Sequence, residues 1–410
     1  MNLQSGTYYW PATLPDPPTY PALSEDLVCD ILIVGGGSSG AQSAYALANS
    51  GLRVVVIEKN TIGSGSTATN TALIQYSGEK MFTDLIHTFG EEATARHLQL
   101  LRQAIDQLET TAGNVAMDFE FRRRDTLYFA SCDEDVAKLH KEYQYLKDHG
   151  CSLDFWDRKT VKAHYPFSHE AAIYSYGDAE LNPFKFTHAL LQDAAAKGVG
   201  IYEHTAMNGH RYDRERQRMI VTTRGGHHID ARYVIFAAGY EGIDIRKEPQ
   251  ASFVSTYTVT TEPIADLSSW YNRTLIWETA RPYLYLRTTA DDRVIIGGLD
   301  ETTDIAEQRD NKLHHRQQQL MDALRQRFPD ISFELAYANT AFYGGIRDGL
   351  PLIGQYDDYP HCYFIFAFGD NGTVYSQTLV NVIVDDIVQG YSPDMELYRQ
   401  DRPVLNSVST

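Results

Sequence analysis

The sequence DILIVGGGSSGAQSAYALANSGLRVVVIEKN, residues 30–60, has the order of elements found in a βαβ unit that binds a dinucleotide. Two short runs of β-branched residues, at 31–34 and 54–57, predict strands that are buried on both faces of a parallel sheet. Residues 39–49 predict a helix between them, and its free N–H groups and positive dipole end would face the phosphates of the ligand. A bare G-x-G-x-x-G arises easily by chance in a chain with 29 glycines. A strand, a helix and a terminal acid in this order around it do not.

Each glycine of this motif has its own physical role. Gly35 permits the tight turn, Gly37 lets the backbone approach a pyrophosphate, and Gly40 lets the helix pack on the strand. Glu58 ends the second strand, where a carboxylate can accept hydrogen bonds from a ribose 2′-OH. An acid at this position argues against a 2′-phosphate and therefore against NADP. The motif alone leaves open whether the chain binds a flavin or a nicotinamide.

Composition and charge narrow the class of protein. Of the 410 residues, 43% are hydrophobic and 12% are aromatic, which is ample for a large core and unlike a disordered chain. The 54 acidic and 36 basic residues give a formal charge of −18, and no tract rich in Lys or Arg offsets it. Because such a field repels phosphate backbones, a nucleic-acid partner is not expected.

The cysteines, the histidines and the first residues carry no metal or targeting signal. The four cysteines form no C-x-x-C pair, and the histidine pairs at 227–228 and 314–315 lack ligand spacing, so no metal site is expected. Residues 1–26 have neither the basic nor the apolar region of a signal peptide. No apolar run approaches the roughly 20 residues that span a membrane. We therefore expect a cytoplasmic protein with reduced cysteines and no membrane span; the oligomeric state is not predicted.

Helix patterns and buried-strand patterns occur near both ends of the chain and in its middle. Between them, residues 251–300 alternate in the manner of an antiparallel sheet, and residues 313–328 predict an amphipathic helix. We therefore expect an α/β fold, with a Rossmann-type dinucleotide domain of discontinuous segments and an α+β substrate domain that contains an antiparallel sheet. The expected segments are 1–26 as an extended arm over the surface, 27–90, 160–250 and 336–410 as the dinucleotide domain, and 91–159 and 251–335 as the substrate domain. A role of the arm at a subunit interface stays open.

Several separated stretches resemble one flavoprotein family. Directly after Glu58, GSGSTATNTALIQY (63–76) resembles a family loop that passes along the flavin ribityl chain and pyrophosphate. VIFAAGYEG (234–242), FYGGIRDGLPLIG (342–354) and GDNGTVYS (369–376) resemble a second cofactor motif, a late strand and the C-terminal flavin contact. The chain is thus similar to the D-amino-acid-oxidase-like superfamily of glycine oxidase and sarcosine oxidase. YYW near the N-terminus and the N-G of the last motif point to its gamma-glutamylputrescine-oxidase-like branch.

The resemblance implies that the cofactor is FAD, because a nicotinamide enzyme needs neither the loop after Glu58 nor the C-terminal glycine turn. It also implies non-covalent binding, since the stretch ANTAFYGG has no cysteine and residues 63–72 have no histidine at which family members attach flavin. The cofactor contacts that we expect from the motifs are Gly35, Gly37, Ser39, Gly40, Glu58, Lys59, Gly65, Ser66, Thr67, Ala68, Met207, Ala237, Ala238, Gly239, Gly345, Asp370, Asn371, Gly372 and Thr373.

Asp370 departs from the family pattern, in which this branch usually carries G-G-N-G. The glycine turn opens a helix whose N-terminal N–H groups could face the flavin carbonyl that becomes negative on reduction. An ionised Asp370 pointing at the flavin would oppose that negative charge and lower the reduction potential. Alternatively, its side chain turns outward or caps the helix.

The resemblance implies oxidation of a C–N bond in an amine or amino acid, with hydride passing from the α-carbon to flavin N5. The protein mainly positions the substrate in such a reaction, so no acid–base residue is nominated. Arg347 matches an arginine beside the flavin in glycine-oxidase-like members and would bind a carboxylate; a salt bridge to Asp348 or to another acid is the alternative. The side chains that we expect to wall the substrate cavity are those of Tyr257, Tyr283, Tyr285 and Arg287.

The electron acceptor stays open at this stage. The sarcosine-oxidase branch has a lysine in the strand before its glycine pair, whereas the matching strand here, residues 293–298, reads RVIIGG. The leading hypothesis is an FAD-dependent amine or amino-acid oxidoreductase. The alternatives are a dehydrogenase that uses an acceptor other than oxygen, and a flavin-binding subunit with little turnover of its own.

Overall fold

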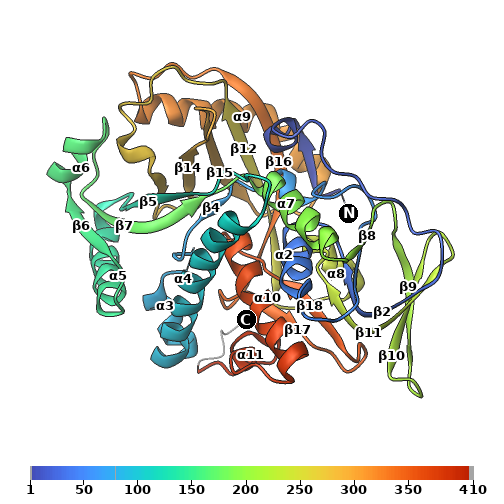
Figure 1. The fold of residues 1–410 in the computed structure, drawn as a ribbon. Coiled ribbons are helices and arrows are strands. Elements are labelled where there is room, and N and C mark those ends of the chain that lie inside the picture. The colour runs from blue at the N-terminus through green and yellow to red at the C-terminus, as the bar shows by residue number, and fades with distance from the viewer. Residues whose placement is uncertain (1, 79, 406–410) are drawn as a thin grey trace.

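The computed structural model describes residues 2–78 and 80–405, whose strands form two sheets (Figure 1). The first sheet contains β1 (Gln4–Gly6), β4 (Leu73–Ile74), β5 (Arg122–Phe129), β6 (Leu153–Asp157), β7 (Ala171–Glu180), β12 (Ala251–Thr261), β13 (Leu275–Glu278), β14 (Leu284–Thr288), β15 (Val294–Glu301) and β16 (Leu335–Ile346). These strands pair in the order β1-β16-β12-β15-β14-β13-β5-β7-β4, with β6 on β7. The second sheet contains β2 (Leu27–Val34), β3 (Val54–Ile57), β8 (Gly200–Tyr202), β9 (Met207–Asp213), β10 (Arg218–Thr223), β11 (His228–Phe236), β17 (Leu352–Gly354) and β18 (Cys362–Phe366). Its order is β17-β18-β11-β2-β3-β8, with β10 on β11 and β9 on β10.

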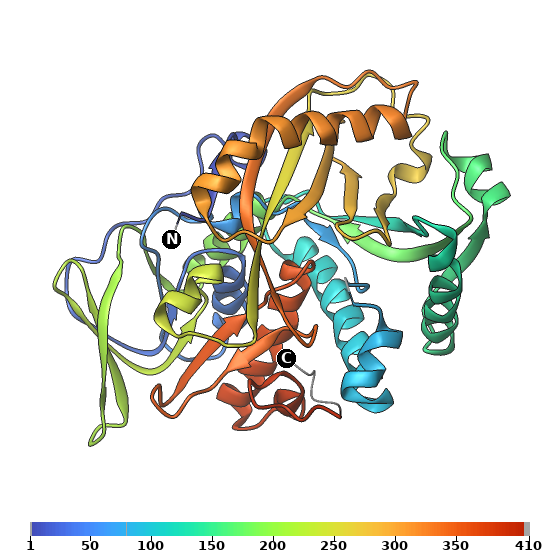
Figure 2. The same ribbon diagram turned by 180° about the vertical axis from the view of Figure 1, so that it is seen from behind.

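The helices pack on these sheets from several sides. They are α1 (Tyr9–Ala12), α2 (Ser38–Leu47), α3 (Phe82–Phe89), α4 (Glu91–Asn114), α5 (Val136–Asp148), α6 (Arg158–His164), α7 (Pro183–Ala196), α8 (Gly242–Ile245), α9 (Ala306–Arg327), α10 (Gly372–Gln389) and α11 (Met395–Tyr398). On one face of the second sheet α7, α2 and α10 lie in a row, and α4 packs on α10 (Figure 1). On the first sheet α9 runs across the strands (Figure 2).

The opening motif forms the βαβ unit that its pattern predicts. Strands β2 and β3 are parallel and pair through Ile33 and Val56, and β8, β11 and β18 extend the parallel array. Side chains on alternate positions of β2 enter different cores, because successive residues of a strand point to opposite faces. Ile31 and Ile33 pack with the helices, whereas Leu32 packs with the β9–β10 hairpin and α8 on the other face.

The alternating region forms the predicted antiparallel sheet. Strand β12 pairs with β15 on one side and with β16 on the other, so that Val259 lies opposite Ile296 and Ala338. Tyr257 and Val259 face the core under α9. The same core contains the buried side chains of the helix predicted at residues 313–328. The opposite face of β12 points toward the middle of the molecule, where Thr256 and Thr258 line a chamber described below.

Sheet membership differs from the expected segments in three places. Strands β4, β7 and β16 fall in segments assigned to the dinucleotide domain, yet all three pair within the first sheet. Conversely, α4 falls in a segment assigned to the substrate domain but packs on α10. These differences share one cause: strand pairing joins residues far apart in sequence, such as Tyr257 and Thr340, and no local pattern specifies it.

The N-terminal arm is built into the protein rather than laid over its surface. Strand β1 pairs with β16, and the side chains of Tyr9 and Trp10 are 5% and 3% exposed. Further along, Tyr20 N donates to a Glu203 carboxylate oxygen over 2.8 Å. The arm therefore joins the first sheet to the edge of the second.

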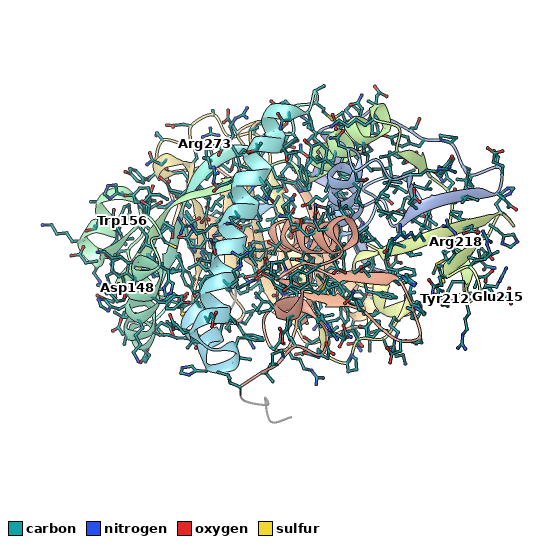
Figure 3. All side chains as sticks on the ribbon, turned by 60° about the horizontal axis from the view of Figure 1, so that its bottom comes forward. Asp148, Trp156, Tyr212, Glu215, Arg218 and Arg273 are labelled. Atoms are coloured by element: carbon teal, nitrogen blue, oxygen red, sulfur yellow. The ribbon has the colours of Figure 1, made fainter. Side chains whose placement is uncertain are left out.

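The described residues 2–78 and 80–405 contain no helix that is long and apolar enough to cross a membrane. The four cysteines are free thiols. Tyr212, Glu215 and Arg218 of the β9–β10 hairpin lie at one end of the molecule, and Asp148 of α5 and Trp156 of β6 lie at the other (Figure 3).

A buried ion pair fixes the turn that carries the chain from β16 to β17. Arg402, after α11, donates to the two carboxylate oxygens of Asp348 over 2.8 and 2.6 Å and to the carbonyl oxygens of Leu350 and Pro351. Both side chains are buried, at 2% and 7% exposed. Asp348 thus pairs with Arg402, so the alternative of an Arg347–Asp348 salt bridge is wrong.

We expect Arg402→Leu to lower the free energy of unfolding by about 3 kcal/mol, because the Asp348 carboxylate would stay buried without its cation. The matched control is Arg325→Leu, which removes a 54% exposed partner of Asp322 and should cost less than about 1 kcal/mol. Chemical denaturation of both variants measures the difference. Equal losses in the two variants would contradict the role of the buried pair.

Candidate cofactor and substrate site

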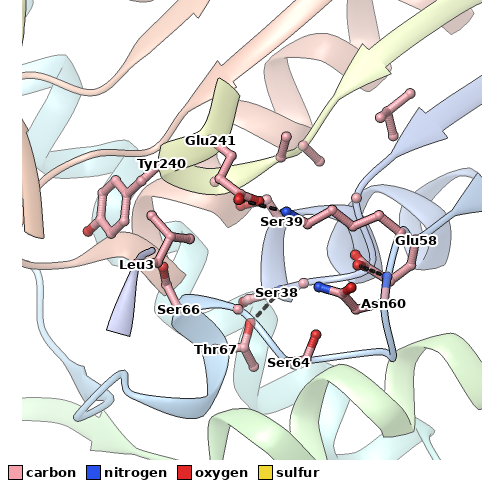
Figure 4. A pocket seen from close by; sticks show the side chains of 18 of the residues that line it. Leu3, Ser38, Ser39, Glu58, Asn60, Ser64, Ser66, Thr67, Tyr240 and Glu241 are labelled. Carbon is pink, nitrogen blue, oxygen red and sulfur yellow. Dashed lines mark hydrogen bonds and ion pairs between the residues drawn. The ribbon is translucent and has the colours of Figure 1, made fainter. Parts of the chain in front are cut away.

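The main cavity has a volume of about 570 Å³ and lies at the carboxyl ends of the parallel strands, where open α/β sheets bind their ligands. The stretches that line it include the opening βαβ unit, the loop after Glu58, the end of β11 and the start of α10. Figure 4 shows part of this wall, with Ser38, Glu58 and Thr67 labelled. The expected cofactor residues that line this cavity are Gly35, Gly37, Ser39, Glu58, Lys59, Gly65, Ser66, Thr67, Met207, Ala237, Ala238, Gly239, Gly372 and Thr373.

The backbone of this cavity fits a long dinucleotide. A Cβ on Gly35 would lie 2.4 Å from Ala237 O, so β2 and β11 meet through backbone alone. By contrast, a Cβ on Gly65 or on Gly239 would meet nothing within 4 Å, so these two glycines leave the cavity wall open.

Two helix N-termini also face the main cavity. Gly37 precedes α2, Asn371 precedes α10, and neither makes a side-chain capping bond. The first N–H groups of a helix have no intrahelical partner and attract anions. The cavity therefore suits FAD, with α2 available to its pyrophosphate and α10 to its flavin carbonyl.

Glu58 is held by its own backbone surroundings. Its carboxylate accepts hydrogen bonds from Gly36 N and Asn60 N, each over 2.8 Å. The bond from Asn60 is visible in Figure 4. Burial raises the pKa of Glu58, and these two hydrogen bonds oppose that shift. Because a carboxylate has about four acceptor positions, Glu58 can still accept from a ribose. At the rim, Lys59 Nζ lies 2.6 Å from Glu241 Oε1 and links β3 to the turn after β11.

Asn2, Leu3 and Gln4 also line the main cavity, and no sequence motif predicts that they do. Gln4 Nε2 donates to Ser64 O over 3.0 Å, directly onto the loop after Glu58. Arg309 of α9 is fully buried, and its Nη1 donates to Leu3 O over 2.8 Å. The hydrogen bonds of Gln4 and Arg309 cannot be predicted from a local motif, because they join residues about 60 and 300 positions apart in the sequence.

Arg287 supports the cofactor loop instead of facing the substrate. Its guanidinium donates to Ala72 O over 2.6 Å and to Leu181 O over 3.0 Å, and it lies over the Trp10 ring. Trp10 in turn donates from Nε1 to Asn70 O over 2.6 Å. Contrary to the expectation, Arg287 does not line the inner chamber described below, and its Nη1 and Nη2 atoms donate to backbone carbonyl oxygens.

The main cavity continues into two further spaces. An inner chamber of about 120 Å³ shares Ser66, Asn70, Tyr240 and Gly372 with it. An outer chamber of about 400 Å³ then opens from the inner one. The residues that line both chambers are Tyr283, Asp300, Tyr343, Gly369 and Asp370.

Tyr283 and Tyr285 line the inner chamber together with Trp277, where the sequence places a substrate wall; substrate contact itself stays a prediction. Tyr257 does not line it. That side chain is fully buried under α9, and its hydroxyl lies 3.5 Å from Arg309 O. The expectation for Tyr257 is wrong because neighbouring residues of a strand face opposite sides, and Thr256 and Thr258 occupy the chamber side of β12.

Five expected cofactor residues lie outside the main cavity. Gly40 and Ala68 are buried behind its wall, and Gly345 lines the outer chamber. Asn371 donates from Nδ2 to Ser77 O over 2.6 Å and so fixes the turn before α10. Asp370 lines both chambers, and Asn371 occupies the N-cap position of α10.

Arg347 lines the outer chamber and not the inner one. Its side chain is exposed, and its carbonyl oxygen accepts a 2.7 Å hydrogen bond from Lys80 Nζ. The arginine that the resemblance places beside the flavin is thus at the outer rim of the site.

A buried polar chain supports the floor of the inner chamber. Gln75 lines the chamber and donates from Nε2 to Thr126 Oγ1 over 3.4 Å, and Thr126 donates to Asp178 Oδ2 over 2.6 Å. Asp178 is 1% exposed. Burial raises the pKa of Asp178 to about 7, although the hydrogen bonds from Thr126 and Tyr76 N oppose the shift.

Asp178 makes the stability of the fold depend on pH. Because its pKa is raised in the folded protein, its contribution is fully present below about pH 4 and is lost as the pH rises toward 7. We expect Asp178→Asn to remove that loss, so that the variant gains up to about 4 kcal/mol on the unmodified protein between pH 4 and pH 8. Unfolding free energies at the two pH values test this. A gap that stays constant with pH, as expected for the exposed control Asp322→Asn, would contradict it.

Gly40 tests the packing of the opening motif. A Cβ there would lie 1.9 Å from Gly35 O, so we expect Gly40→Ala to displace the turn and weaken FAD retention at least tenfold. Gly113→Ala is the control: this glycine is exposed near the end of α4, with nothing within 4 Å of an added Cβ, and the change should stabilise the helix by about 0.5–1 kcal/mol. Flavin absorbance after gel filtration reports retention. Normal retention in Gly40→Ala would refute the packing role.

Comparison with known proteins gives relatives that share part of the chain. The putative Rieske 2Fe-2S iron-sulfur protein YhfW of Bacillus subtilis (strain 168) is 29% identical over 236 residues, which are 58% of this chain and 45% of the relative. The gamma-glutamylputrescine oxidoreductase of Escherichia coli (strain K12) is 25% identical over 289 residues, 68% of this chain and 66% of the relative. The chain thus spans about half to two thirds of the length of these two relatives.

The fold and the family agree with the cavity. The crystal structure of glycine oxidase from Geobacillus kaustophilus superimposes with a TM-score of 0.74 at 21% identity, covering 89% of this chain and 96% of that one. The family model DAO, described as FAD dependent oxidoreductase, matches residues 30–378. The chain therefore belongs to this family of FAD-dependent oxidoreductases. The close backbone approach at Gly35 and the two helix N-termini at the main cavity agree with this assignment.

Proposed function

We propose that this protein oxidises a C–N bond of an amine or amino acid and uses FAD held in the main cavity. The observation that carries the proposal is the continuity of the site. The inner chamber shares Ser66, Asn70, Tyr240 and Gly372 with the main cavity, so a ligand in the chamber would meet the cofactor at this junction.

The residues of the chain supply binding, orientation and exclusion of water. Bound FAD supplies the acceptor for a hydride from the carbon next to nitrogen. Tyr283 and Trp277, at 5% and 3% exposed, close the inner chamber on the side of the first sheet. Gln75 is oriented by Thr126 and Asp178 and offers an amide to the ligand. Such positioning lowers the barrier without any acid–base side chain.

The relatives support this reaction class. One relative is named a gamma-glutamylputrescine oxidoreductase, and the structural neighbour is a glycine oxidase. Both names describe oxidation of an amine or amino acid, and the glycine oxidase shares the fold of this chain. A cytoplasmic location stays a prediction from the composition.

A second candidate concerns the electron acceptor. The Bacillus relative is named a Rieske iron–sulfur protein, and its length extends well beyond the part that this chain matches. Strand β15 carries no lysine, and Arg293 before it pairs with Asp291 and Glu262. We infer that an iron–sulfur partner, instead of oxygen, is the alternative acceptor. In the extreme form of this second candidate, the protein is a flavin-binding subunit that turns over only when such a partner accepts its electrons.

The function is tested by anaerobic addition of amines and amino acids to the FAD-loaded protein. We expect the absorbance near the visible flavin maximum to bleach with at least one compound, because hydride transfer reduces the cofactor. The control is the same panel with Gly40→Ala, which should hold little FAD and show no bleaching. A fully loaded protein that no compound bleaches would contradict the proposed oxidation.

Stopped-flow mixing of the reduced protein with air separates the acceptors. Reoxidation faster than turnover identifies an oxidase and removes the second candidate. Slow reoxidation in air, together with fast reoxidation by ferricyanide, supports the iron–sulfur acceptor, because ferricyanide and an iron–sulfur cluster both accept one electron at a time.

A further inference from the structure

The charged side chains of the two chambers differ: in the part of the chain that the structure describes, the inner chamber is lined by carboxylates alone, whereas the outer chamber is lined by carboxylates, including that of Glu301, together with basic side chains. The described residues that line the inner chamber include the carboxylates of Asp300 and Asp370 but no Lys, Arg or His. The basic side chains Lys80, Arg281 and Arg347 line only the outer chamber. The part of the site next to the cofactor is therefore acidic, and the cations lie farther out.

The two carboxylates come from separate elements. Asp300 belongs to β15 of the first sheet, and Asp370 belongs to the turn before α10. The Tyr375 hydroxyl donates to Asp370 Oδ1 over 3.4 Å. Two fixed elements of the fold thus bring negative charge to one small chamber.

Aromatic rings form the other wall. Trp277 stacks on Tyr128 with ring centroids 3.8 Å apart, and Tyr283 lies 5.6 Å from Tyr285. The Trp277 ring is held in place by this stacking. Rigid rings beside carboxylates bind ammonium groups through both the ring quadrupole and Coulomb attraction.

The neighbouring hydroxyls respond to this negative charge. The pKa of Tyr240 is raised to about 12, mainly by burial; Asp300 and Asp370 contribute to the rise, and a backbone hydrogen bond from Gly344 opposes it. Burial likewise raises the pKa of Tyr285, and Asp300 adds to the shift. Both tyrosines therefore stay neutral, and Asp300 and Asp370 are the charged side chains among the described residues that line the inner chamber.

A carboxylate on the reacting carbon would be placed badly in this field. In an α-amino acid the carboxylate is one bond from the carbon that is oxidised, so it would share the inner chamber with Asp300 and Asp370. Like charges at such distances repel strongly where water is excluded. An ammonium group in the same place is attracted.

We propose that the inner chamber binds the cationic head of an amine that has no carboxylate on the reacting carbon, and that Asp300 and Asp370 select it. A carboxylate elsewhere in the substrate is tolerated only at the far end, in the outer chamber with Arg347. This assignment rests on the proposed amine oxidation for its substrate, but the chamber's preference for cations is measurable without turnover.

The test uses the FAD-loaded protein and tetramethylammonium, a cation that has no N–H and is not oxidised in this reaction. Binding is read from the flavin absorbance and from the fluorescence of tryptophan. The neutral comparison is tert-butanol, which has nearly the same shape, and the anionic comparison is acetate. We expect tetramethylammonium to bind at least tenfold more tightly than either.

Asp300→Asn and Asp370→Asn are the test variants, and Asp322→Asn on α9 is the matched control. Each test variant should raise the dissociation constant of tetramethylammonium about tenfold and leave that of tert-butanol unchanged, whereas the control should change neither. A change smaller than twofold in both test variants overturns the proposal. If a variant loses FAD or folds poorly, the comparison of the three probes in the unmodified protein decides: equal binding of tetramethylammonium and tert-butanol overturns the proposal.

Turnover separates this proposal from the proposed function. N-methylglycine and dimethylamine differ only by the carboxylate, and the expected kcat/KM is at least tenfold higher for dimethylamine. Preferential oxidation of N-methylglycine, without selective binding of tetramethylammonium, would overturn the cation site and leave amine oxidation intact. Selective binding of tetramethylammonium with no oxidation of any amine would keep the cation site and contradict the proposed function.

Discussion

The close approach of three backbone segments at Gly35 is the constraint on which the rest of the structure depends. Gly35 has a φ of 118°, which favours glycine, and the space of its missing Cβ is taken by Ala237 O. The space of the missing Cβ on Gly40 is taken in the same way by Gly35 O. Because these contacts are between backbone atoms, no side-chain repacking can replace them. They set where β2, α2 and β11 end relative to one another, and hence where the main cavity lies.

The second sheet alone does not complete the site. The loop after Glu58 receives hydrogen bonds from the arm through Gln4 and Trp10 and from the first sheet through Arg287. Arg309 fixes Leu3 beside the same cavity. The cofactor site is therefore built jointly by both sheets and by the first residues of the chain. Loss of any of these contacts would remove a hydrogen bond that positions the cofactor site.

Much of this could be predicted from local sequence and the rest could not. The βαβ unit, the antiparallel region and most residues of the main cavity follow from short patterns, because the backbone geometry of a strand–turn–helix needs particular residues at fixed spacing. Arg287 and Tyr257 were misplaced because alternation predicts which residues share a face but not which neighbour covers that face. The assignment of β7 and β16 to the first sheet depends on pairing across the chain. Whether the flavin potential responds to Asp370 stays a prediction.

We expect the flavin ring to lie at the junction of the main cavity and the inner chamber, where both are lined by Ser66, Tyr240 and Gly372. A crystal structure of the protein with FAD measures this most directly. We expect one FAD per chain, with its pyrophosphate at the start of α2 and its ring at this junction, facing the inner chamber. A ring located elsewhere, or one whose face toward the inner chamber is covered, would contradict it.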